Sequence, residues 1–505
     1  MIRRRLRAIT WAGLAAVVLC ATVNLTRWPA PWFDEGIHLH VPEALVRFGA
    51  YADYSSEGLR HFGPTQAVGP TVMLPIAGAF ALFGVGLLQA RLVMVAYLLA
   101  FAAAFYLLGR RLGGRAVGLV AVALLVSAPG PSVLEYGRQA LGEVPGGFLL
   151  AAGLLAWFAA WTTPTLGRLA LAGLVLGLAT ATKHVYLLAL GPALLAAWVL
   201  NLFYYRRVPQ RVFLVTGSIC AAVFALWQVI VLGWLSPGGL AENWALLRRT
   251  SEGAAFVFNT ETSRRSLADL LGAQGYFGLL LPALLYTGWR ARTRTIREQQ
   301  WGVVWLIAAA NLGWYVLASN GWTRYAFVGL TLSAPMVARM VRDAARVVAA
   351  ARRRGAAGAH ALAAVLPLWM AVVIGLPMAG TAARLVAPPA ADAAAAAEWL
   401  TTHVPAGDIV ETWEPELEVF TDHRYHYPPP ALLIRAVAYI SHGGEPPATF
   451  YAFREAGAPA FVVVGAFARW VGLYADADLT ADYDIAHRQG AYVVWKRRGP
   501  ADKTE

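Results

Sequence analysis

The stretch PWFDEGIHLH, residues 31–40, places two adjacent carboxylates, Asp34 and Glu35, directly after an apolar segment that begins MIRRRLR. If the arginines stay in the cytoplasm, the acidic pair lies at the opposite surface of the membrane. Two interpretations are open at this point. The pair can be the solvated start of a helix, because acidic residues suit the first helical turn. It can also supply a catalytic base at the boundary between lipid and water.

The composition predicts a polytopic α-helical membrane protein. Of the 505 residues, 58% are hydrophobic and 14% are charged, whereas soluble domains carry about 25% charged residues. The net charge is +13, but most of the excess lies in short loops between apolar runs. This pattern indicates membrane orientation and no nucleic-acid partner. Cys20 and Cys220 each lie inside an apolar run, so no disulfide framework is expected.

We predict about eleven membrane spans, because each needs ~20 largely apolar residues. The first covers about residues 8–27 and is expected to be retained, since no A-x-A cleavage site follows it. LPIAGAFALFGVG, residues 74–86, is short and contains Pro75, which favours an interfacial or re-entrant helix. The second predicted span runs from near Arg91 to GRRLGGR, and the next three cover about residues 116–128, 144–161 and 169–182. The sixth to tenth spans end at YYRRVPQR, near Trp234, at WRARTRTIR, at SNGWTRY and at ARMVRDAARVVAAARRR, and the eleventh covers about residues 361–386.

The basic residues set the expected orientation. They cluster in alternate loops, as the positive-inside rule requires for cytoplasmic loops. The N-terminus is therefore expected in the cytoplasm and the C-terminus outside. The cytoplasmic clusters are Arg3 to Arg7, Arg110 to Arg115, Arg206 to Arg211, Arg290 to Arg297 and Arg339 to Arg354.

The composition changes near Pro388. Short β-branched and aromatic runs then alternate with helix-like stretches such as AAAAAEWLTTH. We therefore expect a transmembrane domain over residues 1–387 and a small extracytoplasmic α/β domain over 388–505. The external loops are predicted at residues 28–70, 129–143 and 236–270.

The polar residues that could carry chemistry fall in the external loops, and ionisable groups at a membrane boundary indicate a functional site. Lys183 and Arg324 could simply reach the interface with their charged ends, but together with Arg138 they could bind a phosphate. His38 and His40 are possible ligands of a divalent metal. The external set is Asp34, Glu35, His38, His40, His61, Glu135, Arg138, Glu143, Lys183, His184, Glu242, Arg248, Arg249, Glu261, Arg264, Arg265 and Arg324.

Several motifs in order resemble the GT-C superfamily of membrane glycosyltransferases that use polyprenyl-phosphate-linked sugars. The nearest branch holds the protein O-mannosyltransferases and the lipid A aminoarabinose transferases. The motifs are the Asp34–Glu35 pair, HFGPT and PIAGAFALFGVGLLQARL between His61 and Leu92, GRRLGGR, GRQALGEVPG, GLATATKH and WTRY. The resemblance covers most of residues 1–345 and implies a GT-C fold.

The resemblance also implies site residues. Asp34 would be the general base, Glu35 would orient its surroundings or the acceptor, and Glu143 would position a substrate. Lys183, Arg138 and Arg324 are the phosphate candidates, and His61 and His184 complete the substrate-binding set.

The implied reaction is the transfer of a sugar from a polyprenyl-phosphate donor to an acceptor hydroxyl at the outer face of the cytoplasmic membrane. Because a phosphate leaves already charged, one base and one cationic clamp suffice for a displacement with inversion. The acceptor stays open between lipid, polysaccharide and protein, and membrane lipids are further expected partners. The alternatives are a transporter or lipid flippase, which would place charges mid-membrane, and a scaffold with merely solvated acids.

Overall fold

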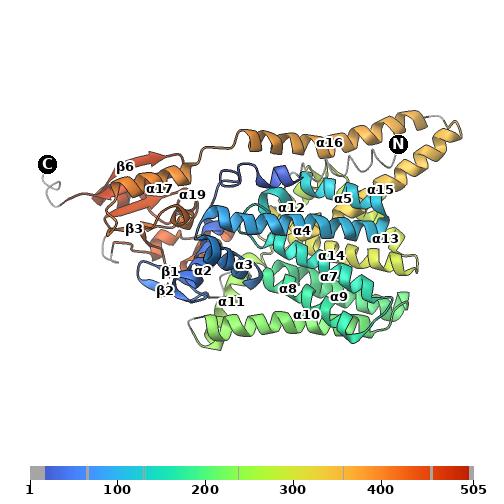
Figure 1. Ribbon diagram of the computed structural model, residues 1–505, viewed down its shortest axis with the longest axis horizontal. Helices are drawn as coiled ribbons and strands as arrows, with labels where there is room; N and C mark the ends of the chain where they lie inside the picture. The colour runs from blue at the N-terminus through green and yellow to red at the C-terminus, as the bar shows by residue number, and fades with distance from the viewer. Residues whose placement is uncertain are drawn as a thin grey trace.

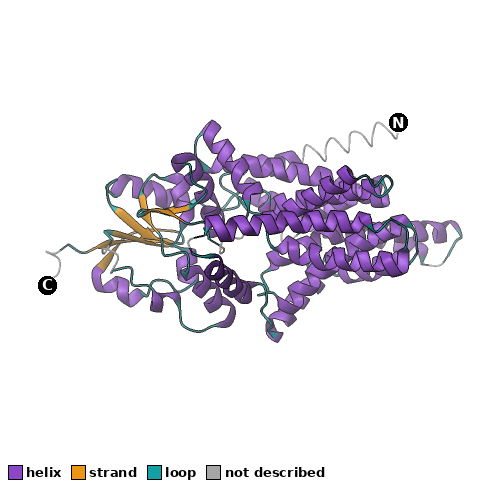
Figure 2. Ribbon diagram, turned by 90° about the horizontal axis from the view of Figure 1, so that it is seen from below, coloured by secondary structure: helices purple, strands orange, loops and turns teal. Residues whose placement is uncertain are grey.

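The computed structural model describes residues 17–63, 68–128, 130, 132–236, 238–356, 358–454 and 459–499. A long bundle of helices carries a small sheet-containing domain at one end (Figure 1). The strands of the described residues lie in that end region, and the rest of the described chain is mostly helical (Figure 2). The α-helical membrane fold with a small C-terminal α/β domain is therefore confirmed.

Ten helices of the bundle match the predicted second to eleventh spans. The start of the first predicted span, residues 8–16, lies outside the described residues. The matching helices are α4 (Leu87–Gly113), α5 (Arg115–Ser127), α7 (Glu143–Ala160), α8 (Leu166–Thr182), α9 (Val185–Leu200), α10 (Arg211–Ile230), α13 (Leu280–Ala291), α14 (Ile296–Ala318), α15 (Phe327–Arg353) and α16 (Ala359–Val386).

Helix length limits which of these can cross a membrane alone. Within the described ranges, six helical segments are long and apolar enough to span one. They are Leu87–Gly113, Glu143–Ala160, Val185–Tyr205, Arg211–Leu235, Ile296–Ala318 and Ala359–Val386. By contrast, α13 has 12 residues, about 18 Å of helix against a hydrocarbon core of about 30 Å. The total of about eleven membrane spans stays a prediction.

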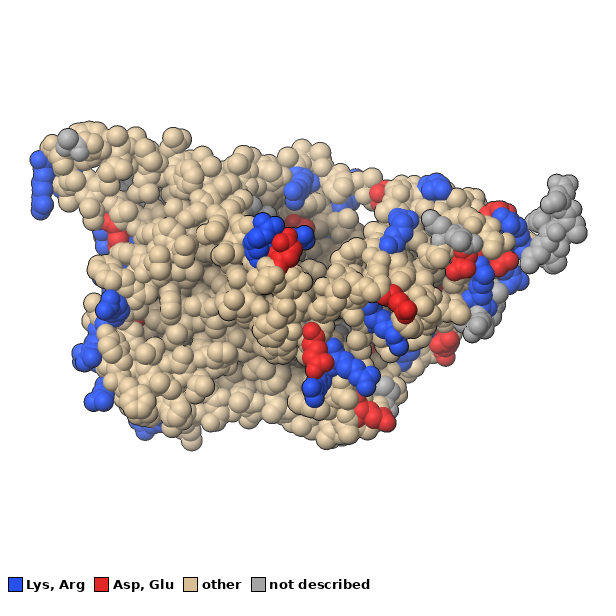
Figure 3. All heavy atoms as spheres, turned by 180° about the vertical axis from the view of Figure 1, so that it is seen from behind, with Lys and Arg blue, Asp and Glu red and all other residues tan. Residues whose placement is uncertain are grey.

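The two sets of loops lie at opposite ends of the bundle. The Arg207 guanidinium donates to the carbonyl of Arg294 at 2.7 Å, and Arg342 donates to the carbonyl of Gly113. The loops that follow α9 and α13 thus meet, and the end of α4 contacts the second half of α15. Lys and Arg side chains gather at the end of the molecule away from the sheet domain (Figure 3). The alternation of the predicted loops is therefore present in the bundle, and its orientation in the membrane stays a prediction.

The predicted external loops contain regular structure. Residues 236–270, expected as a polar loop, form α11 (Leu240–Ala254) and most of α12 (Thr260–Leu271). The Asn259 side chain caps α12 by accepting from the backbone amides of Glu261 and Thr262 at 2.9 and 3.2 Å. The other loop elements are α2 (Phe33–Phe48), β1 (Asp53–Ser55), β2 (Gly58–Arg60), α3 (Pro70–Phe83) and α6 (Val133–Tyr136).

The C-terminal domain contains a five-stranded sheet in the order β4-β3-β5-β7-β6. The pairs β3–β4 and β3–β5 are parallel, whereas β5–β7 and β6–β7 are antiparallel. Its elements are α17 (Asp392–His403), β3 (Ile409–Thr412), η4 (Pro415–Phe420), β4 (Arg424–His426), α18 (Leu432–His442), η5 (Pro447–Phe450), β5 (Phe461–Val464), α19 (Ala466–Trp470), α20 (Asp476–Asp482), β6 (Tyr483–Gln489) and β7 (Tyr492–Arg497).

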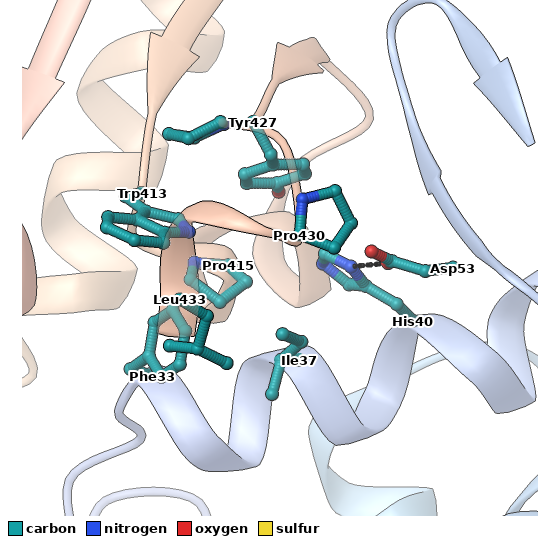
Figure 4. Close-up of a pocket in the computed structure, with 10 residues that line it drawn as sticks. Phe33, Ile37, His40, Asp53, Trp413, Pro415, Tyr427, Pro430 and Leu433 are labelled. Carbon is teal, nitrogen blue, oxygen red and sulfur yellow. Dashed lines mark hydrogen bonds and ion pairs between the residues drawn. The ribbon is translucent and has the colours of Figure 1, made fainter. Parts of the chain in front are cut away.

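The first external loop docks on this domain. Arg60 donates to the carbonyls of Tyr427 and Pro428 at 2.6 and 3.0 Å, and the His426 imidazole contacts the Glu57 carboxylate at 2.9 Å. Phe33 and Ile37 of α2 face Trp413, Pro415 and Leu433 across a small apolar cleft (Figure 4). The helix that carries Asp34 is therefore packed directly against the C-terminal domain.

Gly36 makes this packing possible. A Cβ atom at residue 36 would lie 2.3 Å from the amide nitrogen of Glu416 and 2.5 Å from the carbonyl carbon of Pro415. Both atoms belong to the backbone of η4, which cannot swing aside as a side chain can. Only glycine allows α2 and η4 to approach this closely.

We predict that Gly36→Ala separates α2 from η4 and destabilises the protein by about 1–3 kcal/mol, as overpacking does. Thermal unfolding in detergent measures the loss, and proteolysis between residues 387 and 391 reports release of the domain. Gly78→Ala in α3 is the matched control, because no atom lies within 4 Å of a Cβ there. Equal stability of the two variants would contradict this packing.

Candidate active site

A cavity of about 630 Å³ lies between the bundle and the C-terminal domain. The membrane-domain wall comes from α2, the α8–α9 junction, α11 and the segment between α14 and α15. The opposite wall comes from α18 and α19. The polar and charged side chains that line it are Asp34, His38, Tyr136, Lys183, His184, Thr250, Ser251, Thr323, Arg324 and Tyr325.

Asp34 and Arg324 form an ion pair across the cavity wall, although 290 residues separate them. Asp34 lies in the first turn of α2, and Arg324 lies in η3 (Thr323–Ala326). The Arg324 guanidinium carbon is 4.8 Å from the Trp322 ring centre and 5.6 Å from that of Trp32. These rings and the carboxylate fix the orientation of the guanidinium.

The charge state of Asp34 follows from its neighbours. Burial alone would raise the pKa of Asp34, but Arg324 and, to a smaller extent, Lys183 hold that pKa below its ordinary value. Asp34 is therefore a carboxylate at neutral pH. The pKa of Arg324 is raised, because the attraction of Asp34 outweighs the effect of burial.

Lys183 and Glu143 form a second ion pair beside the first. Lys183 lies in extended backbone at the end of α8, and Glu143 begins α7. Burial lowers the pKa of Lys183, against the opposing attraction of Glu143. The second carboxylate oxygen of Glu143, Oε2, is buried without a hydrogen-bond partner among the described residues. Glu143 itself does not line the cavity, so its direct contact with Lys183 is its link to the site.

Glu35 and Arg138 lie outside the cavity lining. Glu35 is fully buried and accepts from Arg91 Nε at 2.9 Å and from the amide of Ala140 at 3.1 Å. Arg138 is also fully buried and donates to the carbonyls of Trp28, Cys20 and Val23. Both side chains therefore hold the loop around residues 20–35. The structure does not bring Arg138 to the other two cations, because these carbonyl oxygens occupy its donors.

His38 has a defined tautomer. Its Nδ1 lies 2.8 Å from the carbonyl oxygen of Ala140, and a carbonyl oxygen only accepts hydrogen bonds. Nδ1 therefore carries the hydrogen, and Nε2 of the neutral ring is an acceptor. Burial lowers the pKa of His38 more than Asp34 raises it. His38 is thus a neutral acceptor one helical turn from Asp34 and lines the same cavity.

The other predicted histidines lie in different places. His184 lines the cavity, and its Nε2 is 3.1 Å from Nε2 of Gln228. His40 contacts Asp53 at 2.7 Å (Figure 4) and Glu418 at 3.0 Å, away from the large cavity. His61 is exposed and does not line the cavity. Of these three histidines, His184 therefore lies in the same cavity as Asp34 and Lys183, whereas His40 and His61 do not.

The described residues contain no group of three or more His, Cys, Asp or Glu side chains that could hold a metal ion. His38 and His40 are two residues apart on α2, so their rings point to different surroundings. The possible role of His38 and His40 as metal ligands stays a prediction.

Sequence reasoning missed two contributions to the site. Arg91 donates to the buried Glu35 carboxylate. Its position as a lone arginine inside an apolar run could have predicted a buried ion pair. The apolar wall comes from residues whose proximity to Asp34 no local pattern predicts. These include Leu433, Ile434, Val437 and Ile440 of α18 and Phe467 and Trp470 of α19.

The comparisons with known proteins confirm the predicted resemblance. A family profile described as dolichyl-phosphate-mannose-protein mannosyltransferase matches residues 67–229, about a third of the chain. This range includes Glu143 and Lys183 but not Asp34 or Arg324. No curated protein matches the chain.

Solved structures share the fold along the whole chain. ArnT from Cupriavidus metallidurans bound to undecaprenyl phosphate has a TM-score of 0.65 at 14% identity, covering 98% of each chain. Archaeal oligosaccharyltransferase AglB from Archaeoglobus fulgidus, in complex with an inhibitory peptide and a dolichol-phosphate, has a TM-score of 0.62 at 13% identity. That match covers 97% of this chain and 74% of AglB. The chain has the GT-C fold.

We predict that Arg91→Ala lowers the free energy of unfolding by about 3–5 kcal/mol, because it leaves the buried Glu35 carboxylate unpaired. Thermal unfolding in detergent measures the change. The control is Arg248→Ala, which breaks an exposed ion pair with Glu252 and is expected to cost under about 1 kcal/mol. A stable Arg91→Ala protein would refute the supporting role of this pair.

Proposed function

We propose that the chain is an inverting membrane glycosyltransferase that moves a sugar from a polyprenyl-phosphate donor to an acceptor hydroxyl. One observation carries this proposal: Asp34, Arg324 and Lys183, from three distant segments, line one cavity where the bundle meets the C-terminal domain. The family profile and the GT-C fold support a glycosyltransferase that uses a lipid-linked sugar.

The proposed reaction is one displacement. The acceptor oxygen attacks the anomeric carbon, the bond from that carbon to the phosphate oxygen breaks, and the prenyl phosphate leaves with the bonding electrons. The acceptor proton goes to Asp34, which lines the cavity and would act as the general base. Arg324 and Lys183 stabilise the charge that develops on the phosphate.

The carboxylates of the site favour inversion over retention. A retaining reaction needs a second carboxylate as nucleophile. Glu35 is fully buried against Arg91, and Glu143 is held by Lys183 and is 1% exposed. Among the described residues, Asp34 is the carboxylate that lines the cavity, so a single base fits the arrangement best.

The ion pair between Asp34 and Arg324 suggests that the donor binds before the acceptor. Without donor, Arg324 holds the pKa of Asp34 low and makes it a weak base. A donor phosphate would compete with Asp34 for Arg324, and the pKa of Asp34 would then rise. Donor binding would thereby make Asp34 a stronger base before the acceptor reacts.

His38 and the C-terminal domain complete the proposed site. Nε2 of His38 would accept a hydrogen bond from a substrate hydroxyl beside Asp34. The apolar wall of α18 and α19 would enclose the acceptor, which is a lipid, polysaccharide or protein. We place this site at the outer face of the cytoplasmic membrane, with the N-terminus in the cytoplasm and the C-terminal domain outside.

The position of the charges speaks against a transporter or flippase. Such proteins bind substrate near the middle of the membrane, beside broken helices. Asp34, Lys183 and Arg324 instead lie at the end of the bundle, under the C-terminal domain. A scaffold would not need this convergence of charges in an enclosed cavity.

We predict that Asp34→Asn lowers sugar transfer by about 10²–10⁴-fold, the usual contribution of a general base, while the protein stays folded. Transfer of labelled sugar from a prenyl-phosphate donor in membranes of an expressing strain measures this effect. Asp422→Asn is the control, because its side chain is 88% exposed. Full activity of Asp34→Asn would overturn the assignment of the base.

We predict that Lys183→Ala weakens the apparent affinity for the prenyl-phosphate donor by about tenfold or more, as loss of a charged hydrogen bond does. Because the single variant leaves Glu143 unpaired, the double variant Lys183→Ala/Glu143→Gln tests the same loss without a stranded buried charge. Lys496→Ala on the exposed side of β7 is the control. Unchanged donor affinity in both Lys183 variants would remove this residue from the phosphate site.

A further inference from the structure

A second cavity lies between α15 and α16, far from the candidate active site. It is a groove of about 540 Å³, within the usual size range of small-molecule sites. The two helices meet at the end of the molecule away from the sheet domain (Figure 1). The lining residues are Ala345, Val348, Ala349, Arg352 and Arg353 of α15 and His360, Ala363, Leu366 and Pro367 of α16.

The two helices form this groove because they leave the bundle. The first half of α15, Phe327–Arg339, is buried, whereas every residue of the second half, 340–353, is exposed or partly exposed. Only 6% of the most apolar window of α16 is buried. Alanines 345, 349 and 363 line the space between the helices, and their small side chains leave it open.

The groove is polar at one end and apolar at the other. Arg352, Arg353 and His360 flank the turn that joins the helices, and Val348, Leu366 and Pro367 lie deeper along them. No described carboxylate forms an ion pair with Arg352 or Arg353. The acid nearest in sequence, Asp343, is already paired with Arg342 and Arg346.

This pattern matches the chemistry of an anionic phospholipid. Arginine binds a phosphate through two parallel hydrogen bonds, and an acyl chain fits an apolar channel beside it. The groove lies at the end of the bundle where Lys and Arg side chains gather (Figure 3). That end is expected in the cytoplasmic leaflet, whose anionic lipids attract basic residues.

We propose that the groove binds one anionic phospholipid, with its phosphate at Arg352 and Arg353 and an acyl chain between α15 and α16. The site is independent of the proposed glycosyl transfer. Its ligand is a membrane lipid and not the donor, because the groove lies at the opposite end of the bundle from Asp34.

Native mass spectrometry of the full chain tests this site with dioleoyl phosphatidylglycerol against dioleoyl phosphatidylcholine as probes. The wild-type protein should retain one molecule of the anionic lipid in preference to the neutral one. The variant Arg352→Gln/Arg353→Gln should bind it about tenfold more weakly. The matched control, Arg292→Gln/Arg297→Gln, removes two exposed arginines from the same end of the bundle and should bind as the wild type does.

The variant Ala363→Phe distinguishes lipid binding in the groove from lipid attraction to a basic surface, because the larger side chain fills the groove without changing the charge. This variant should also lose the retained lipid. Equal loss in the two arginine double variants, or full binding by Ala363→Phe, would overturn the proposal. Thermal unfolding of each variant confirms that the hairpin of α15 and α16 remains folded.

Discussion

The ion pair between Asp34 and Arg324 is the interaction on which the rest of the site depends. It joins the first turn of α2 to the segment between α14 and α15, two parts of the chain that are 290 residues apart in sequence. Because both groups are largely buried, each stabilises the charged form of the other. The pair also leaves a carboxylate and a cation facing the same cavity. In the proposed reaction, a base and a phosphate-binding group would thereby be in place before any substrate arrives.

Buried charges around this pair fix its surroundings. Arg91 pairs with Glu35, and Arg138 donates to the carbonyls of Trp28 and Cys20. Neither arginine reaches the cavity, yet both hold the loop that places α2. The C-terminal domain supplies the remaining constraint, since η4 contacts the backbone of α2 at Gly36. The position of Asp34 thus depends on both domains of the chain.

Local sequence patterns predicted much of this arrangement. Apolar runs and basic clusters gave the helices and the grouping of the loops, because helix length and charge placement are set residue by residue. Asp34, Lys183 and Arg324 were predicted, and the structure brings them together. Whether they act as proposed remains a prediction.

Long-range packing accounts for what the sequence left out. Arg138 resembled a phosphate ligand, but carbonyl groups more than a hundred residues away occupy it. The apolar wall of α18 lies near Asp34 only because the C-terminal domain folds back over α2. Residues 236–270 read as a polar loop because their helices are amphipathic and short. The contacts of Arg138 and of α18 leave no periodic signal in the chain, because their partners are distant in sequence.

A structure of the protein with a polyprenyl phosphate bound tests the central claim most directly. Our account predicts that the phosphate lies between Arg324 and Lys183, that Arg324 turns from Asp34 toward it, and that the prenyl chain leaves the cavity toward the bilayer. A phosphate bound elsewhere, with the Asp34–Arg324 pair unchanged, would contradict the account.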